Sequence, residues 1–281
     1  MKQIHSHIAK GNKAARAHKT DLVDGFDVSN AGFVMVRHVS NEITNRYWNE
    51  CCRCIQSIYS SKVRILIIDN DSNYEYVKQS SNLDMENITV VKSEYEKCGE
   101  IVGYYYFYKM RPFHRAVILH DTMFVKQNMN FAVDDVKFMW HFSGTVRPSE
   151  STPSVRGFLE SMGGNLTHIY DHYNWVGCMG TASVITHSFL STIVEKYDFF
   201  NKTLPFMNVK PHREAIERVF AIACISLKPS LLVDPSVFGD IYEYYGSRHF
   251  DMRSYDFNSY LADSRGLPFI KVWSLRPETW K

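Results

Sequence analysis

The segment VRILIIDNDS, residues 63–72, joins a nearly continuous apolar run to an acidic turn. An apolar run of this kind is typical of a strand that is buried on both faces, as in a parallel sheet covered by helices. We therefore expect a strand over residues 63–68 that ends at Asp69-Asn70-Asp71. These polar residues would stand at the carboxyl end of the strand.

Upstream of this segment, another strand leads into a helix. The apolar residues 32–36 end at Arg37-His38. Asn41 is a good N-cap, and the apolar side chains that follow it recur at three- and four-residue spacing. This pattern predicts an amphipathic helix after the first strand.

Downstream, two more apolar runs continue the alternation of strand and helix. Residues 88–91 form the first run, and residues 116–119 form the second and lead into His120-Asp121, with an aromatic-rich helix expected over 99–110. Strands that alternate with helices predict an α/β fold with a Rossmann-like, mostly parallel sheet flanked by helices. Ligands bind such sheets at the carboxyl ends of the strands, where the polar residues of this sequence gather.

The second half of the chain is less regular, and no linker or repeat separates it from the first. We expect Met123 to Val125 to continue beyond the fourth strand, 116–119. A strand-like run over 136–142, a Ser/Pro-rich loop over 144–154, and helices over 188–197 and 213–225 should follow. The length fits one elaborated domain. We predict a basic N-terminal extension, 1–30, and a single domain, 31–281, with a nucleotide-binding half, 31–130, and an acceptor half, 131–281.

Composition narrows the class of protein. The 281 residues are 45% hydrophobic and carry a formal net charge of +2, so the chain should fold and has no global field that would attract nucleic acid. We find no apolar stretch of the roughly 20 residues needed to cross a bilayer and no secretory signal, which favours a cytoplasmic protein. Among the six cysteines, Cys51, Cys52 and Cys54 lie at helix-like spacing that suits buried free thiols.

Two strand-end motifs and their order resemble a known enzyme family. The motif IIDNDS, residues 67–72, follows the second strand, and ILHDTMF, residues 118–124, follows the fourth. Over roughly residues 32–225, this organisation resembles the GT-A glycosyltransferases, particularly the family-2-like enzymes. The resemblance implies a nucleotide-diphospho-sugar transferase fold, a UDP- or GDP-linked sugar donor, and transfer to a hydroxyl of a carbohydrate or other acceptor.

The same resemblance implies roles at the donor end. In the family, an acidic pair after the second strand holds the base or ribose, which points to Asp69 and Asp71. An Asp-x-Asp motif after the fourth strand holds Mn²⁺ or Mg²⁺, but here Asp121 is its only carboxylate, although hard cations prefer oxygen ligands. His120 and the late His249 would complete a metal site by this resemblance.

Cations near the strand ends are needed for the donor's diphosphate if no metal neutralises it. We therefore add a set of basic and polar residues to the donor site. The donor candidates besides the two acids are Arg37, His38, Lys109, Arg111, Arg115, His120 and Asp121.

Two later motifs resemble the acceptor side of the family. In WVGCMG, residues 175–180, Trp175 would stack on a sugar and Gly177 would allow close approach of the backbone. HREAIERVF, residues 212–220, resembles the helix that carries a catalytic or supporting acid. The candidates for the base that accepts the acceptor's proton are Glu217, Glu214 and Asp171.

Other functions remain open on the sequence alone. A nucleotide- or sugar-binding protein without catalysis would share the same strand-end residues, and the 17 Tyr and 18 Phe could line a protein interface instead. A dinucleotide oxidoreductase and a P-loop enzyme are disfavoured, because neither of their glycine-rich motifs occurs.

Overall fold

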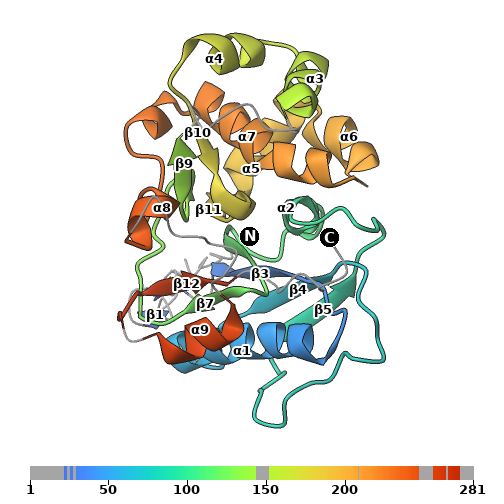
Figure 1. Ribbon diagram of the computed structural model, residues 1–281, viewed down its shortest axis with the longest axis vertical. Helices are drawn as coiled ribbons and strands as arrows, with labels where there is room; N and C mark the ends of the chain where they lie inside the picture. The colour runs from blue at the N-terminus through green and yellow to red at the C-terminus, as the bar shows by residue number, and fades with distance from the viewer. Residues whose placement is uncertain are drawn as a thin grey trace, which may run out of the picture.

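The computed structural model describes residues 22–23, 26–27, 30–143, 152–207, 209–246, 256–263 and 265–272. At its centre is a six-stranded sheet with helices on both faces (Figure 1). In spatial order, the strands are β5 (Ile88–Lys92), β4 (Ile65–Asp69), β3 (Ala31–Arg37), β6 (Arg115–His120), β11 (Ser183–Thr186) and β8 (Val136–Phe138).

Strand direction divides this sheet into two parts. β3 pairs in parallel with β4 and β6, and β4 pairs in parallel with β5. β11 is antiparallel to both β6 and β8. The sequence-based prediction of an α/β fold with a mainly parallel sheet is therefore confirmed.

Side chains of β3 explain why this strand is apolar at successive positions. Phe33 and Met35 belong to one hydrophobic core, whereas Val34 and Val36 belong to the other, on the opposite face of the sheet. Because successive side chains of a strand point to opposite faces, a strand covered on both sides needs apolar residues throughout.

The first core lies between the sheet and α1 (Glu42–Tyr59). Asn41 caps this helix, accepting a hydrogen bond from Thr44 N at 2.9 Å, while the Thr44 hydroxyl accepts from Asn41 N at 3.0 Å. This capping box satisfies two backbone donors that the helix end would otherwise leave unpaired. The same side carries α8 (Ile241–Tyr244), α9 (Phe257–Ala262) and the antiparallel pair of β7 (Met123–Val125) and β12 (Phe269–Lys271).

The second core lies between the other face of the sheet and α2 (Ile101–Met110), with a group of helices stacked beyond it (Figure 1). The long helix α7 (Lys210–Leu227) runs through the middle of that group, where it contacts α3, α4, α5 and β10. The remaining elements on this side are α3 (Thr152–Met162), α4 (Leu166–His172), α5 (His187–Tyr197), α6 (Phe199–Thr203), β9 (His141–Ser143) and β10 (Val176–Cys178).

Three predictions about elements need correction. The run 136–142 is two strands, because β8 pairs with β11 in the main sheet while β9 pairs with β10 in a separate ribbon. Met123 to Val125 likewise leaves the sheet and pairs with β12. The loop expected over 144–154 ends earlier, since α3 begins at Thr152 with a proline in its first turn, where the missing N–H of proline breaks no helical hydrogen bond.

Other sequence-based expectations meet the structure at particular points. All six cysteines are buried and free of disulfides, as predicted. Most of the predicted extension 1–30 lies outside the described residues. The part that is described before residue 30 is the antiparallel pair of β1 (Leu22–Val23) and β2 (Phe26–Asp27). Among the helices that the structure describes, none is long and apolar enough to span a membrane.

Candidate functional site

A cleft of about 660 Å³ opens at the carboxyl ends of β3, β4 and β6. This is the edge at which open α/β sheets bind their ligands. The loop before α2 and the first turn of α7 form the other side of the cleft. Its polar lining comprises His38, Asn70, Asp71, Lys97, Glu100, His120, Asp121 and Arg213.

Beneath this cleft, Arg37 and Asp69 form a buried ion pair. They stand opposite each other in the register of β3 and β4, and Arg37 Nε donates to Asp69 Oδ2 at 2.7 Å. Their exposed fractions are 3% and 0%, and the Arg37 guanidinium lies over the Trp48 ring, 4.9 Å from its centroid. Each charge is neutralised by the other, and neither Arg37 nor Asp69, both predicted to contact the donor, is among the residues that line the cleft.

The Asp69 carboxylate also shapes the turn that follows it. Its Oδ1 accepts a hydrogen bond from Ser72 N at 3.3 Å. Asp71, inside this turn, has a φ of 65°, and its exposed side chain lines the cleft. The buried acid of the predicted pair therefore holds the turn, and the second acid faces the ligand space.

Hydrogen bonds tie the ends of the three strands together. His38 N donates to Asp121 Oδ2 at 3.0 Å, and Asp121 N donates to Val36 O at 3.0 Å. His38 Nδ1 donates to Asn70 O at 2.9 Å. Burial raises the pKa of Asp121 to about 7, so this carboxyl is protonated far more readily than an exposed aspartate.

His120 has a defined tautomer in this arrangement. Its Nε2 lies 2.6 Å from Gly180 O, and a carbonyl oxygen only accepts, so Nε2 carries the proton. Burial, together with the positive charge of Lys271, lowers the pKa of His120 to about 4, which keeps the ring neutral near pH 7. Its Nδ1 is therefore an acceptor, 3.8 Å from Glu100 Oε1.

Gly180 links His120 to Glu217. Glu217 Oε1 accepts from Gly180 N at 2.7 Å, while the Gly180 carbonyl accepts from His120. Gly180 has a φ of 58°, and a Cβ there would lie 3.2 Å from His120 Cε1. A residue without a side chain is therefore favoured at the point where the peptide passes between the two groups.

Burial raises the pKa of Glu217 to about 7, and the negative charge of Glu100 adds to this shift. Lys271, on β12, is 8% exposed and lies in the same electrostatic neighbourhood as Glu100, Glu217 and Asp121. Burial lowers the pKa of Lys271, whereas the three carboxyl groups favour its charged form. Sequence reasoning missed Lys271, because nothing local marks it as a site residue.

Sequence reasoning also missed two cations on the side of the cleft that the loop before α2 and the first turn of α7 form. Lys97 is exposed and precedes Gly99, whose φ of 63° shapes the loop before α2. The Asn70 amide holds this loop by accepting from Gly99 N at 2.7 Å and donating to Tyr95 O at 2.9 Å. Arg213, from α7, packs against Gly99, and its Nε is buried without a hydrogen-bond partner among the described residues.

Several predicted cations lie away from this cleft. Arg115 is the first residue of β6, at the amino end of the strand whose carboxyl end carries His120, and its Nε donates to Val133 O at 2.8 Å. Arg111 is the C-cap of α2, before that amino end, and Lys109 pairs with Glu94 at 2.8 Å on the surface. None of these three predicted donor residues is among those that line the cleft.

None of the three candidate bases is among the residues that line the cleft, and two of them are paired elsewhere. Asp171 pairs with Arg156 at 2.6 Å between α4 and α3, and Glu214 pairs with Lys210 at 3.3 Å within α7. Each carboxylate is neutralised at the surface by its partner. Glu217 is instead linked by hydrogen bonds to a residue of the cleft lining, because Gly180 bonds both to Glu217 and to His120.

The predicted acceptor residues have packing roles. Trp175 is 8% exposed, stacks on Tyr170 and donates from Nε1 to Tyr170 O at 3.0 Å. A Cβ at Gly177 would lie 2.0 Å from the Phe142 ring, so this glycine lets β10 pack against β9. Neither residue lines the cleft.

The predicted metal ligands are not assembled by the described residues alone. Within that part of the chain, no three His, Cys, Asp or Glu side chains come close enough to hold a metal ion. His120 and Asp121 both line the cleft, but His249 lies outside the described residues.

Comparisons with known proteins give a limited result. No model of a known protein family matches the sequence, and no curated protein shows significant similarity to it. One similar solved structure is galactosyltransferase LgtC with donor and acceptor sugar analogs, at 10% identity and a TM-score of 0.39, covering 67% of this chain and 70% of that one. Another is core-mannan synthase A (CmsA/Ktr4) from Aspergillus fumigatus in a Mn/GDP form, at 11% identity and a TM-score of 0.43. The match covers 79% of this chain and 76% of that one. At these scores the likeness carries no argument about chemistry.

Proposed function

We propose that this protein is a GT-A-type glycosyltransferase that moves a sugar from a nucleotide-sugar donor to a hydroxyl of a carbohydrate or other acceptor. One observation carries the proposal: the cleft at the carboxyl ends of the parallel strands is lined by both acids and cations. A nucleotide sugar combines hydroxyl groups, which acids bind, with a diphosphate, which cations bind. The volume of about 660 Å³ lies in the range of small-molecule sites.

The donor's diphosphate would lie against Lys97 and Arg213. Arg213 presents planar guanidinium donors, and its buried Nε lacks a partner among the described residues. A buried donor without an acceptor costs free energy, and a phosphate oxygen would satisfy it. Asp71 and His38, across the cleft, are then placed for the ribose or base of a UDP- or GDP-linked sugar.

A divalent cation fits this site together with a diphosphate. Asp121 and Glu100 offer carboxylate oxygens in the cleft lining, and His120 Nδ1 is an acceptor beside Glu100. Mg²⁺ is usually held by one or two carboxylates plus substrate phosphates, so a complete protein cage is not needed. When bound, Mn²⁺ or Mg²⁺ would neutralise charge on the leaving diphosphate.

Glu217 is our choice for the group that accepts the proton of the acceptor hydroxyl. A general base works best with a pKa near the working pH, and burial places that of Glu217 at about 7. The hydrogen bond from Gly180 N fixes one carboxylate oxygen, which leaves the other for a proton. Asp171 and Glu214 lack this burial and pair with Arg156 and Lys210 instead.

A thermal-shift screen against UDP-, GDP-, CMP- and dTDP-sugars, each with and without Mn²⁺, tests the proposal. A ligand at 100 times its Kd adds roughly 2.7 kcal/mol to stability. Stabilisation by one nucleotide class, lost in Arg213→Gln but kept in the equally charged surface control Lys62→Gln, is the expected result. No stabilisation by any of these donors would contradict the proposed site.

A turnover assay distinguishes a glycosyltransferase from a non-catalytic nucleotide- or sugar-binding protein. Release of free nucleotide from the stabilising donor, in the presence of acceptor sugars, is expected for the wild type and should disappear in Asp121→Ala. A protein that binds the donor yet never releases nucleotide would be a non-catalytic nucleotide- or sugar-binding protein on the same fold.

A further inference from the structure

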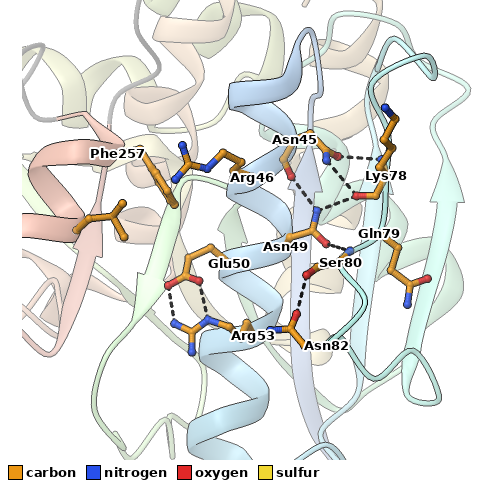
Figure 2. A pocket seen from close by; sticks show the side chains of 11 residues that line it. Asn45, Arg46, Asn49, Glu50, Arg53, Lys78, Gln79, Ser80, Asn82 and Phe257 are labelled. Atoms are coloured by element: carbon orange, nitrogen blue, oxygen red, sulfur yellow. Dashed lines mark hydrogen bonds and ion pairs between the residues drawn. The ribbon is translucent and has the colours of Figure 1, made fainter.

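A second polar groove, of about 420 Å³, lies on the outer side of α1, away from the strand ends (Figure 2). Side chains of α1 form its floor, the segment 78–82 forms one wall, and Phe257 and Leu261 of α9 form the other. None of its lining residues belongs to the cleft described above.

The amide oxygens on the floor of this groove are already used. Asn45 Oδ1 accepts from Trp48 Nε1 at 2.8 Å and from Lys78 N at 3.1 Å. Asn49 Oδ1 accepts from Ser80 N at 2.7 Å. These bonds fasten the wall to the helix, so the groove is preformed (Figure 2).

The acceptors of Asn82 and Glu50 are used as well. Asn82 Oδ1 accepts from Ser80 Oγ at 2.6 Å. The Glu50 carboxylate accepts from Arg53 through both oxygens at 2.6 Å and from the Tyr260 hydroxyl at 2.6 Å. Glu50 and Arg53 thus neutralise each other at the lower end of the groove.

Hydrogen-bond donors, in contrast, are left over. Among the described residues, no acceptor meets the Arg46 guanidinium, the Lys78 ammonium or the Asn82 amide nitrogen, and neither cation has a carboxylate partner. The other lining amide nitrogens are used, because those of Asn45 and Asn49 both donate to Lys78 O at 3.0 Å and that of Gln79 donates to Leu83 O at 3.2 Å. Among the described residues, no donor meets the Gln79 amide oxygen. The groove therefore offers two positive charges and one neutral donor, the Asn82 amide nitrogen, that no described acceptor meets.

Arg46 is held in a fixed orientation. Its guanidinium lies over the Phe257 ring, 4.6 Å from the centroid, and Figure 2 shows it extended along that wall. Stacking on an aromatic face leaves the edge of the guanidinium open, and that edge matches the paired oxygens of an oxyanion. Less side-chain entropy is lost on binding when the donor is already oriented.

We propose that this groove binds a phosphate-bearing ligand, with Arg46 and Lys78 as its two cationic contacts and the Asn82 amide as a neutral donor. A ligand that only accepts hydrogen bonds suits a surface where most of the acceptors are occupied, and a charge of two or more suits two cations that no described carboxylate pairs with. The site is independent of the proposed transferase activity.

Inorganic pyrophosphate is the probe, titrated into the isotope-labelled full chain at low salt while amide and arginine side-chain signals are followed by NMR. We expect saturable shifts of the Arg46, Lys78 and Asn82 signals. Arg46→Gln should weaken this binding at least about tenfold, as for loss of a charged hydrogen bond. Arg46→Lys keeps the charge but loses the planar fork, and should weaken it by a smaller factor.

Two controls separate the groove from general charge and from the cleft. Lys62→Gln, with the same change in charge at the far end of α1, should leave the affinity within twofold. Arg213→Gln should alter the pyrophosphate-induced shifts of cleft signals only, such as that of Gly99, and leave those of the groove unchanged. The proposal is overturned if the groove signals do not saturate with pyrophosphate, or if Lys62→Gln weakens binding as much as Arg46→Gln.

Discussion

Glu217→Gln should change how the stability of this fold depends on pH. Burial raises the pKa of Glu217 from 4.5 to about 7, so the unfolded chain releases this proton first as the pH rises. Stability is then full below about pH 4.5 and falls toward pH 7 in the wild type. Glutamine stays neutral, and its Oε1 can still accept the hydrogen bond from Gly180 N.

The magnitude follows from the two pKa values of Glu217. Ionisation of this group costs the folded wild type about 1 kcal/mol at pH 5 and about 3 kcal/mol at pH 8, a gap of about 2 kcal/mol. Glu217 is partly exposed, and water screening reduces this figure. We therefore expect Glu217→Gln to gain about 1 to 2 kcal/mol over the wild type between these two pH values.

Urea unfolding of both proteins at pH 5 and pH 8 measures this difference directly. Glu214→Gln is the matched control, because Glu214 lies one turn away on α7 and pairs with Lys210 at the surface. Its effect should stay within about 0.5 kcal/mol at both pH values. A Glu217→Gln protein whose stability relative to wild type is the same at pH 5 and pH 8 would refute the assignment of a half-buried carboxyl with a raised pKa.

Two further substitutions test the packing that supports the cleft. Arg37→Ala should destabilise the protein by about 3 to 5 kcal/mol in urea unfolding, because it strands the buried Asp69 charge. Adding Asp69→Asn should recover part of that loss; no recovery would mean that the charge is not the cause. Gly177→Ala should cost about 1 to 3 kcal/mol through its clash with the Phe142 ring, whereas Gly157→Ala, with open space around it in α3, should be neutral or stabilising by up to about 1 kcal/mol. Equal melting temperatures for the two alanine variants would contradict the packing argument.

Local patterns were enough to predict the elements that build the sheet. β3 and β4 are unbroken apolar runs because helices cover both faces, and α1 begins where Asn41 caps it. The polar residues after these strands then fall at one edge, since parallel strands end on the same side. In this way His38, Asp71 and His120 could be placed together from the sequence.

The roles within that edge depended on register, which the sequence does not show. Arg37 and Asp69 are 32 positions apart, and only the parallel alignment of β3 and β4 puts them side by side in the interior. Either one alone resembles a residue that meets a ligand. Their pairing turns both into support for the turn at Asp71.

The direction of a strand is a better guide than composition to which cations lie at the cleft. The rule that places ligands at the carboxyl end of β6 also excludes Arg115, which begins that strand, and Arg111, which precedes it, so strand direction argues against both cations on the sequence alone. Two of the cations that line or border the cleft, Arg213 and Lys271, come from α7 and from β12 near the end of the chain. Tertiary packing brings them to the cleft from sequence positions more than 90 residues past Asp121, where no motif distinguishes them from ordinary basic residues. For the proposed diphosphate contacts, the helix that packs over the loop before α2 is therefore a better source of cations than the strand ends are.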